Sequence, residues 1–239
     1  IKEVLRILEK GFEHVVQRRR PDFAQELISS CLAIVKEDFF KDPIGVFVNE
    51  LSRKQVVEPG RKLIMEFRSS DEKLMVLDWL VELLAQDKRA DKMKNMAMQI
   101  ADELITNAIF NAPIDHAGKR TFQMRDRQDA LIYPEGKAAA RFFACYNDNK
   151  LILGCEDPFG SVRRGQFISF LTENYTDDKV TVPIPGRGIG AGIRMMIDSS
   201  ATFWLYCEPG KKSVFACAIL LDGMKADLAT KKHFHIRVR

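Results

Sequence analysis

Hydrophobic residues in the N-terminal part of the chain recur every three or four positions, which is the spacing of one helix face. The pattern predicts a helix over residues 1–19, which Pro21 ends, a second over 22–35 and a third over 42–53. The apolar stripe of the second helix is expected to face a core. It consists of Phe23, Leu27, Cys31, Ile34 and Val35. Residues 1–56 are therefore expected to form an all-helical appendage, either regulatory or for dimerisation.

From residue 57 onward, apolar runs typical of strands alternate with helical patterns. The expected strands are 62–67, 138–146, 150–156, 201–207 and 213–221. The expected helices are one that Ser69 and Glu72 open as a capping box, one over 96–112, one over 163–171 and one beginning at Ile193. Residues 172–185 are polar, without periodicity, and are expected to be mobile. This order predicts an α+β fold, a two-layer α/β sandwich with helices on one face of a mixed, mostly antiparallel sheet.

Composition narrows the class of protein. The chain has 239 residues, 46% of them hydrophobic and 29% charged, which is typical of a soluble globular protein. No apolar run reaches the roughly 18 residues of a membrane span, and a net charge of +4, dispersed along the chain, does not indicate nucleic-acid binding. The five cysteines lack metal-type spacing, so we expect small core residues in a reducing, cytoplasmic setting. Because the chain begins at Ile1, we expect it to be part of a longer protein.

The helix expected over 96–112 carries an unusual polar row. Glu103, Asn107 and Asn111 are four residues apart, so they stack along one helix face. Asparagine is a poor helix former, and one interpretation is a solvated helix end that frays towards Pro113. The other is a metal and phosphate site, in which the Asn107 carbonyl oxygen is a hard ligand for Mg²⁺ and Glu103 orients or deprotonates a nucleophile.

Two further stretches have the character of ligand sites. Four alternate glycines, from Gly186 to Gly192, run into a helical pattern, and such a loop with a helix N-terminus favours phosphate. Their spacing fits neither a dinucleotide-binding fingerprint nor a Walker A loop. Asp157 ends an apolar strand, with Gly160 three residues later, so its carboxylate could accept from a purine amino group. The alternative is a simple turn with Pro158.

The order of these three elements resembles a known superfamily. Glu103-x-x-x-Asn107-Ala108, Asp157-x-x-Gly160 and Gly186-x-Gly188-Ile189-Gly190 resemble the N, G1 and G2 boxes of the GHKL (histidine kinase-like, Bergerat-fold) ATPases, which include gyrase, Hsp90, MutL and the histidine kinases. The similarity is greatest to the anti-sigma-factor serine kinases. It covers about residues 60–222, so residues 57–239 are expected to form the ATP-binding domain.

The resemblance implies a role for each matching residue. Asn107 would ligate Mg²⁺ that bridges the ATP phosphates, and Glu103 would be the catalytic base. Asp157 would bind the adenine amino group, and residues 161–187 would form a lid over ATP. The residues assigned to nucleotide binding are Asn107, Asn111, Asp157, Gly160, Gly186, Arg187, Gly188, Ile189 and Gly190. The implied activity is transfer of the γ-phosphate to a Ser or Thr of a partner regulatory protein.

The sequence departs from the family pattern at two places. Pro158 and Phe159 stand where a second glycine is usual, and Asn111 stands where many of these kinases have a basic side chain for phosphate. Arg163, Arg164 and Arg187 could supply that charge.

Other functions stay open. One is a non-catalytic nucleotide-binding or protein-interaction module that acts through its N-terminal helices. Another is a histidine kinase with His14 as phosphoacceptor, although Val15 and Val16 follow it instead of an acidic residue. The apolar stripes of residues 1–53 would also suit a homodimer.

Overall fold

The computed structural model describes residues 1–35, 40, 42, 62–115, 117–122, 125, 129–146, 149–176, 190–221 and 232–239. The helices are α1 (Lys2–Glu9), α2 (Phe23–Val35), α4 (Glu72–Leu84), α5 (Lys88–Lys92), α6 (Lys94–Thr106), the π-helical segment η2 (Asn107–Asn111), α7 (Arg164–Thr176) and α8 (Gly190–Ser199). The strands are β1 (His14–Val15), β2 (Lys62–Phe67), β3 (Ala140–Tyr146), β4 (Lys150–Asp157), β5 (Thr202–Glu208), β6 (Lys212–Leu220) and β7 (His233–Val238).

These strands form one sheet in the order β1-β7-β5-β6-β4-β3-β2. The sheet is mixed, because β5 and β7 run parallel while the other neighbouring pairs are antiparallel. The five predicted strands are confirmed as β2 to β6, and the fold is α+β in its element content. Within the described residues, no helix is both long and apolar enough to span a membrane.

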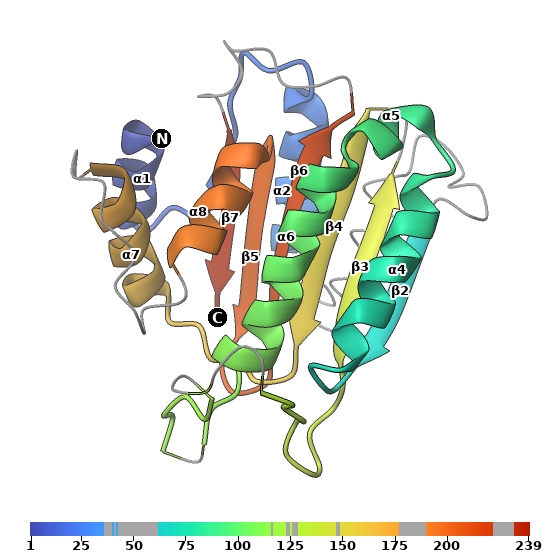
Figure 1. Cartoon of the computed structure of the whole chain (residues 1–239). Helices are drawn as coiled ribbons and strands as arrows, with labels where there is room; N and C mark the ends of the chain where they lie inside the picture. Colours follow the sequence, from blue (N-terminus) through green and yellow to red (C-terminus); the bar gives the residue numbers. More distant parts are fainter. Residues whose placement is uncertain are drawn as a thin grey trace.

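Helices α4, α6 and α8 cover one face of the sheet (Figure 1). Helix α6 presents a fully buried apolar stripe to the sheet, including Ala97, Ile100, Leu104 and Ile105. Its predicted periodicity therefore corresponds to the face that packs on the core. Because that face is fixed against the sheet, the direction of the neighbouring polar row of Glu103 and Asn107 is fixed as well.

The N-terminal segment is not all-helical, which corrects the predicted helix over residues 1–19. Helix α1 ends at Glu9, and Gly11 adopts φ +98° with its N–H bonded to the Leu8 carbonyl at 3.0 Å. Such a left-handed glycine ends a helix readily. The chain then pairs as β1 with β7 at the edge of the sheet. Long-range pairing has overridden the local helical periodicity.

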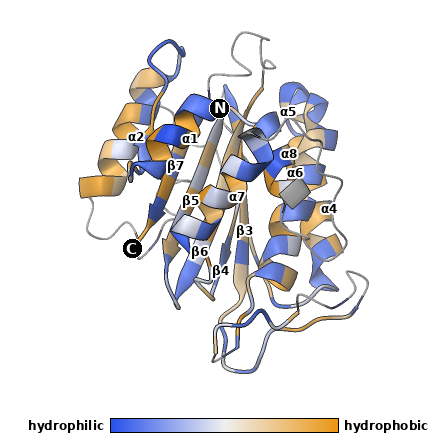
Figure 2. Cartoon of the chain, turned by 90° about the vertical axis from the view of Figure 1, so that its left-hand side faces the viewer, coloured by the Kyte–Doolittle hydropathy of each residue, from blue (hydrophilic) through white to orange (hydrophobic). Residues whose placement is uncertain are grey.

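Helix α2 covers the second face of the sheet, so the prediction of helices on one face only is wrong (Figure 2). A second core cluster on this face joins Ala33 of α2 to strand residues such as Trp204 and Ile152. The predicted inward stripe is also wrong, since Leu27, Ile34 and the Cys31 thiol are exposed. The residues of α2 that face inward are Glu26, Ser30 and Ala33.

The buried polar face of α2 is explained by an ionic cluster beneath it. Lys150 Nζ lies 2.7 Å from Asp22 Oδ2 and 2.6 Å from Glu26 Oε1. His233 Nε2 lies 3.1 Å from Asp22 Oδ1, and the Nδ1 atom of the fully buried His235 lies 3.2 Å from Ser30 Oγ. Burying a charge is costly unless it is paired, so these partners make a polar inward face tolerable.

Three other predictions, about the segment after residue 171, the helix over 42–53 and the cysteines, have different outcomes. Helix α7 continues to Thr176, so the start of the segment expected to be mobile is helical. The third predicted helix, 42–53, lies outside the described residues apart from Asp42. Four of the cysteines are buried, as expected, but Cys31 is exposed.

Acid should destabilise the protein through the buried histidines of this cluster. Burial, with His235 and Arg237 nearby, lowers the pKa of His14 from 6.5 to about 3, and burial also lowers the pKa of His235. Below pH 6.5 the unfolded chain binds protons at these sites that the folded chain does not, so the free energy of unfolding decreases as the pH is lowered. For His14 alone, the free energy of unfolding should drop by about 1 kcal/mol between pH 7.5 and 5.5.

Urea titrations at the two pH values measure this drop, and His14→Asn should reduce it. The carboxylates act in a lower window: burial would raise the pKa of Glu26, but Lys150 and His235 outweigh it and leave that pKa lowered to about 2. Glu26 therefore stabilises the fold above its unfolded pKa, and that contribution is lost only as pH falls from about 4.5 towards 2. A free energy of unfolding that is equal at pH 7.5 and 5.5 would contradict the histidine argument.

Candidate functional site

The predicted polar row is a hydrogen-bonded ladder at the junction of α6 and η2. Asn111 Nδ2 donates to Asn107 Oδ1 at 2.6 Å, and Asn107 Nδ2 donates to Glu103 Oε1 at 3.1 Å. A carboxylate only accepts, so Glu103 fixes the orientation of the Asn107 amide. Asn107 is 8% exposed. The interpretation of Asn107 as a residue on a solvated, fraying helix end is therefore wrong.

The π-helical geometry of η2 leaves the Ala108 carbonyl without a partner in the helix. The Ala112 N–H bonds the Asn107 carbonyl at 2.9 Å instead of the Ala108 carbonyl. The residue that could serve Ala108 in a π pattern is Pro113, which has no N–H. The Tyr133 hydroxyl, 2.8 Å away, donates to the Ala108 carbonyl in its place. Such π segments occur often at functional sites, because they displace side chains from the regular helix face.

Glu103 lies against helix α8. A Cβ atom added to Gly192 would stand 1.8 Å from Glu103 Cδ and 2.1 Å from its Oε1, so a larger residue there would displace the Glu103 carboxyl group from this position. Glu103 is 8% exposed. The glycine-rich run thus has one structural reason in the described residues, which is the contact between Gly192 and Glu103.

Asp157 is buried at the end of β4 with 4% exposure. Its Oδ1 accepts from the backbone N–H of Phe159 at 2.9 Å and of Gly160 at 3.4 Å, and Ser213 bonds the carboxyl as well. Burial raises the pKa of Asp157 to about 7, although these hydrogen bonds oppose the rise. A carboxyl that titrates near neutral pH in a pocket is a common feature of ligand sites.

Gly160 has a role in packing that the sequence did not indicate. Its φ is +56°, and an added Cβ would lie 2.2 Å from the Glu208 carbonyl oxygen and 2.8 Å from the Gly210 nitrogen. The Gly160 carbonyl also accepts from Gly210 N–H at 3.1 Å. This glycine therefore joins the Asp157 turn to the turn between β5 and β6.

One pocket brings the predicted residues Asn107, Asn111 and Asp157 together. Its remaining lining residues are Leu104, Ala108, Ala112, Arg120, Cys155, Ser161, Val162, Arg163, Gln166, Phe167, Phe170, Ile193 and Phe215. Glu103 is not part of this lining, although its neighbour Leu104 is, and its carboxyl group lies against Gly192 of α8. The pocket is therefore lined by the amide groups of η2, by a carboxyl group at the end of β4 and by aromatic rings of α7.

The remaining predicted residues have separate outcomes. Gly186, Arg187, Gly188 and Ile189 lie outside the described residues, and Gly190 is the first residue of α8. Arg163 lines the pocket. Arg164 is engaged elsewhere, because its Nη2 donates to the Leu8 carbonyl at 2.8 Å and to the Phe12 carbonyl at 2.9 Å.

Two findings concern residues interpreted differently or missed from sequence. His14 is in strand β1, with its Nδ1 2.9 Å from His235 Nδ1, and not on the helix face required of the proposed phosphoacceptor. Arg120 lines the pocket, but it lies in a long connection without periodicity, so no pattern in the sequence pointed to it.

The oxygen atoms of the pocket are too few to hold a metal ion alone, so they suit a hard cation only when a phosphate ligand adds further oxygens. No cluster of three or more His, Cys, Asp or Glu side chains that could hold a metal occurs among the described residues. The pocket offers amide oxygens instead, which fits Mg²⁺ because that ion binds few protein groups and completes its shell with water and phosphate oxygens. No protein-family model matches this chain, and neither does any curated protein.

Proposed function

We propose that this protein is an ATP- and Mg²⁺-binding signalling domain of the GHKL type, which transfers the ATP γ-phosphate to a Ser or Thr of a partner regulatory protein. The carrying observation is that Asn107 and Asn111 of one motif and Asp157 of another line one pocket. Motifs that are weak singly gain weight when side chains 50 residues apart in sequence converge on one cavity.

Adenine recognition is assigned to the Asp157 end of the pocket. The Asp157 carboxyl is buried, and its ionised form accepts hydrogen bonds. An adenine amino group would donate to it, and the apolar side chains of Val162 and Phe167 would contact the ring. This is the arrangement expected of a purine site, with one oriented polar group in an apolar pocket.

Asn107 and Asn111 would hold Mg²⁺ and the phosphates at the other end. Glu103 fixes the Asn107 amide so that its carbonyl oxygen faces Asn111 instead of the helix interior. When bound, Mg²⁺ would neutralise phosphate charge and hold the phosphate oxygens. The contribution of the chain itself is then mainly positioning, as in other phosphoryl transfer.

In the proposed transfer, the hydroxyl oxygen of the partner forms a bond to the γ-phosphorus while the bond from that phosphorus to the β-γ bridging oxygen breaks, so ADP leaves. The hydroxyl proton passes to a carboxylate, for which Glu103 is the candidate. Incubation with γ-labelled ATP and candidate partner domains tests this step. Transfer that is lost in Glu103→Gln with MgATP binding retained supports it, and undiminished transfer in that variant refutes the role.

A second candidate function is a nucleotide-binding interaction module without transfer activity. The observation that favours it is the position of Glu103, which contacts Gly192 of α8 and is not part of the pocket lining. In that case Glu103 only orients Asn107. Binding of MgATP without any labelled product would select this function over the kinase.

The pH dependence of ATP affinity should report on Asp157. Because the pKa of Asp157 is about 7 and the adenine amino group needs the ionised carboxylate, affinity should fall by up to about tenfold from pH 8 to pH 6. Asp157→Asn should bind MgATP more weakly at pH 8 and lose this dependence. Calorimetry at both pH values measures it.

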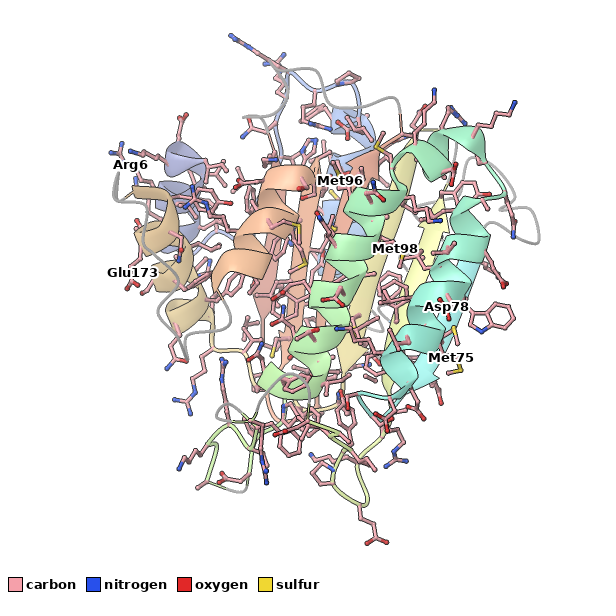
Figure 3. All side chains as sticks on the ribbon, viewed as in Figure 1. Arg6, Met75, Asp78, Met96, Met98 and Glu173 are labelled. Carbon is pink, nitrogen blue, oxygen red and sulfur yellow. The ribbon has the colours of Figure 1, made fainter. Side chains whose placement is uncertain are left out.

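A matched control is Asp78→Asn on the outer face of α4, where Asp78 points away from the sheet (Figure 3). It should keep the affinity and the pH dependence of the unmodified protein. Protonation of ATP itself affects all three proteins equally, so the difference between them isolates Asp157. An equal pH dependence in Asp157→Asn would remove Asp157 from adenine recognition.

A further inference from the structure

Arg120 lines the pocket, and among the described residues it has no acidic partner. Its Nη1 is buried and has no hydrogen-bond partner within the described part of the chain. Burial lowers the pKa of Arg120, and no charged neighbour contributes to that shift. Arginine in proteins stays protonated, so the pocket wall holds a positive charge that nothing in the described residues compensates.

Hydrogen bonds of the 113–121 turn fix the main chain at Arg120. Arg120 forms an antiparallel bridge with Ile114, and the Thr121 N–H donates to the Pro113 carbonyl at 2.9 Å. The Asp115 carboxylate closes the turn between them, since its Oδ1 accepts from the Lys119 N–H at 2.9 Å. This turn follows η2 directly, which brings Arg120 next to the asparagine end of the pocket.

Arg120 is half-buried, and a buried guanidinium nitrogen without a hydrogen-bond partner is costly unless a ligand supplies an acceptor. The neighbouring lining groups limit the kind of ligand. Asn111 and Asn107 are neutral, and Arg163 adds a second cation to the lining. Two arginines beside two amides match a phosphate chain, because guanidinium groups bind phosphate oxygens through two parallel N–H bonds.

We propose that Arg120 forms an anion subsite for the polyphosphate chain of a nucleoside triphosphate. Arg120 would supply the positive charge that the neutral side chain of Asn111 lacks. This inference rests on the proposed function for the identity of the nucleotide. It adds that the pocket selects a polyphosphate over a nucleoside through an arginine in the 113–121 turn.

Calorimetry with three probes tests the subsite, namely MgATP, adenosine and Mg²⁺-tripolyphosphate. Arg120→Ala should weaken MgATP and tripolyphosphate by about 10- to 100-fold and leave adenosine binding unchanged. Arg120→Lys should keep part of the affinity, since it keeps the charge without the planar fork. Arg125→Ala is the matched control, because Arg125 is exposed on the same connection, and it should match the unmodified protein.

The stability of the variants separates binding from folding. Removing an unpaired buried charge should leave the thermal midpoint of Arg120→Ala equal or higher, so a loss of affinity cannot be ascribed to unfolding. Equal binding of MgATP and tripolyphosphate by Arg120→Ala and the unmodified protein would overturn the subsite. A lower midpoint together with weaker adenosine binding would do the same, since Arg120 would then act in packing.

The outcomes also distinguish the subsite from the proposed function. If the unmodified protein binds ATP and Arg120→Ala does so equally well, the subsite fails and the function stands. If tripolyphosphate binds through Arg120 and ATP binds no tighter, the nucleotide function fails and the anion subsite stands. If the unmodified protein binds neither MgATP nor tripolyphosphate at millimolar concentration, the subsite and the proposed function are both wrong.

Discussion

Asn107→Ala should lower the affinity for MgATP by about 10- to 100-fold. Asn107 is the centre of the ladder, with its amide bonded to Glu103 on one side and to Asn111 on the other. Its carbonyl oxygen is the amide oxygen that Glu103 holds in a fixed direction at the pocket. The substitution removes the proposed metal ligand and leaves both neighbours without that partner.

The decisive measurement is ATP binding with Mg²⁺ and with EDTA. If Asn107 acts through the metal ion, the variant should bind ATP equally in both conditions, with the affinity that the unmodified protein has in EDTA. Asn95→Ala, on the exposed start of the same helix, is the matched control and should change neither value. An affinity loss of the same size in EDTA would show a packing effect instead, and full Mg²⁺ dependence in Asn107→Ala would remove the residue from the metal site.

Gly192→Ala should disrupt the site without any change in a pocket-lining residue. Alanine normally stabilises a helix interior by about 1 kcal/mol relative to glycine. Here the new methyl group would occupy the position of the Glu103 carboxyl group, 1.8 Å from Cδ. Glu103 would have to leave Asn107, so we expect a net loss of about 1–3 kcal/mol in the free energy of unfolding and weaker MgATP binding.

A double-mutant cycle identifies the cause. Adding Glu103→Ala to Gly192→Ala removes the obstructing carboxyl group, so the double variant should be more stable than the sum of the single effects by about 1 kcal/mol or more. Gly165→Ala in α7 is the matched control, because its added Cβ would meet no atom within 4 Å, and it should not destabilise the protein. Additive effects in the cycle would mean that the two residues do not interact.

Apart from the short helix α5, which the sequence did not predict, the strands and helices between residues 62 and 221 follow closely from the sequence. Their apolar residues recur with the period of the element they form, and that period is a property of neighbouring residues only. The same reason made the ladder visible in advance, since residues four apart on a helix lie on one face whatever surrounds the helix. The burial of the apolar stripe of α6 follows from the same spacing.

Helix α2 shows where the periodicity argument fails. Its apolar residues indicated an inward stripe, but its inward residues are Glu26 and Ser30. Lys150 Nζ lies 2.6 Å from Glu26 Oε1, and His235 Nε2 lies 3.3 Å from Glu26 Oε2, so the polar face has partners. Lys150 is 124 residues away from Glu26 in sequence. The periodicity of α2 alone cannot predict a partner that is so distant in sequence. Strands β1 and β7 were missed for a related reason, since each depends on its pairing in the sheet.

The sequence by itself determined the order of strands β2 to β6 with helices α4, α6, α7 and α8, the polar ladder of Glu103, Asn107 and Asn111, and the candidate Asp157, because these depend on local spacing and residue chemistry. Only the tertiary structure decided that Asn107 and Asp157 share a pocket, that Gly192 covers Glu103 and that Arg120 lines the same wall. Those relations depend on which surfaces the fold brings together. The free energy that selects them comes from burial and pairing between distant segments, which spacing along the chain does not encode.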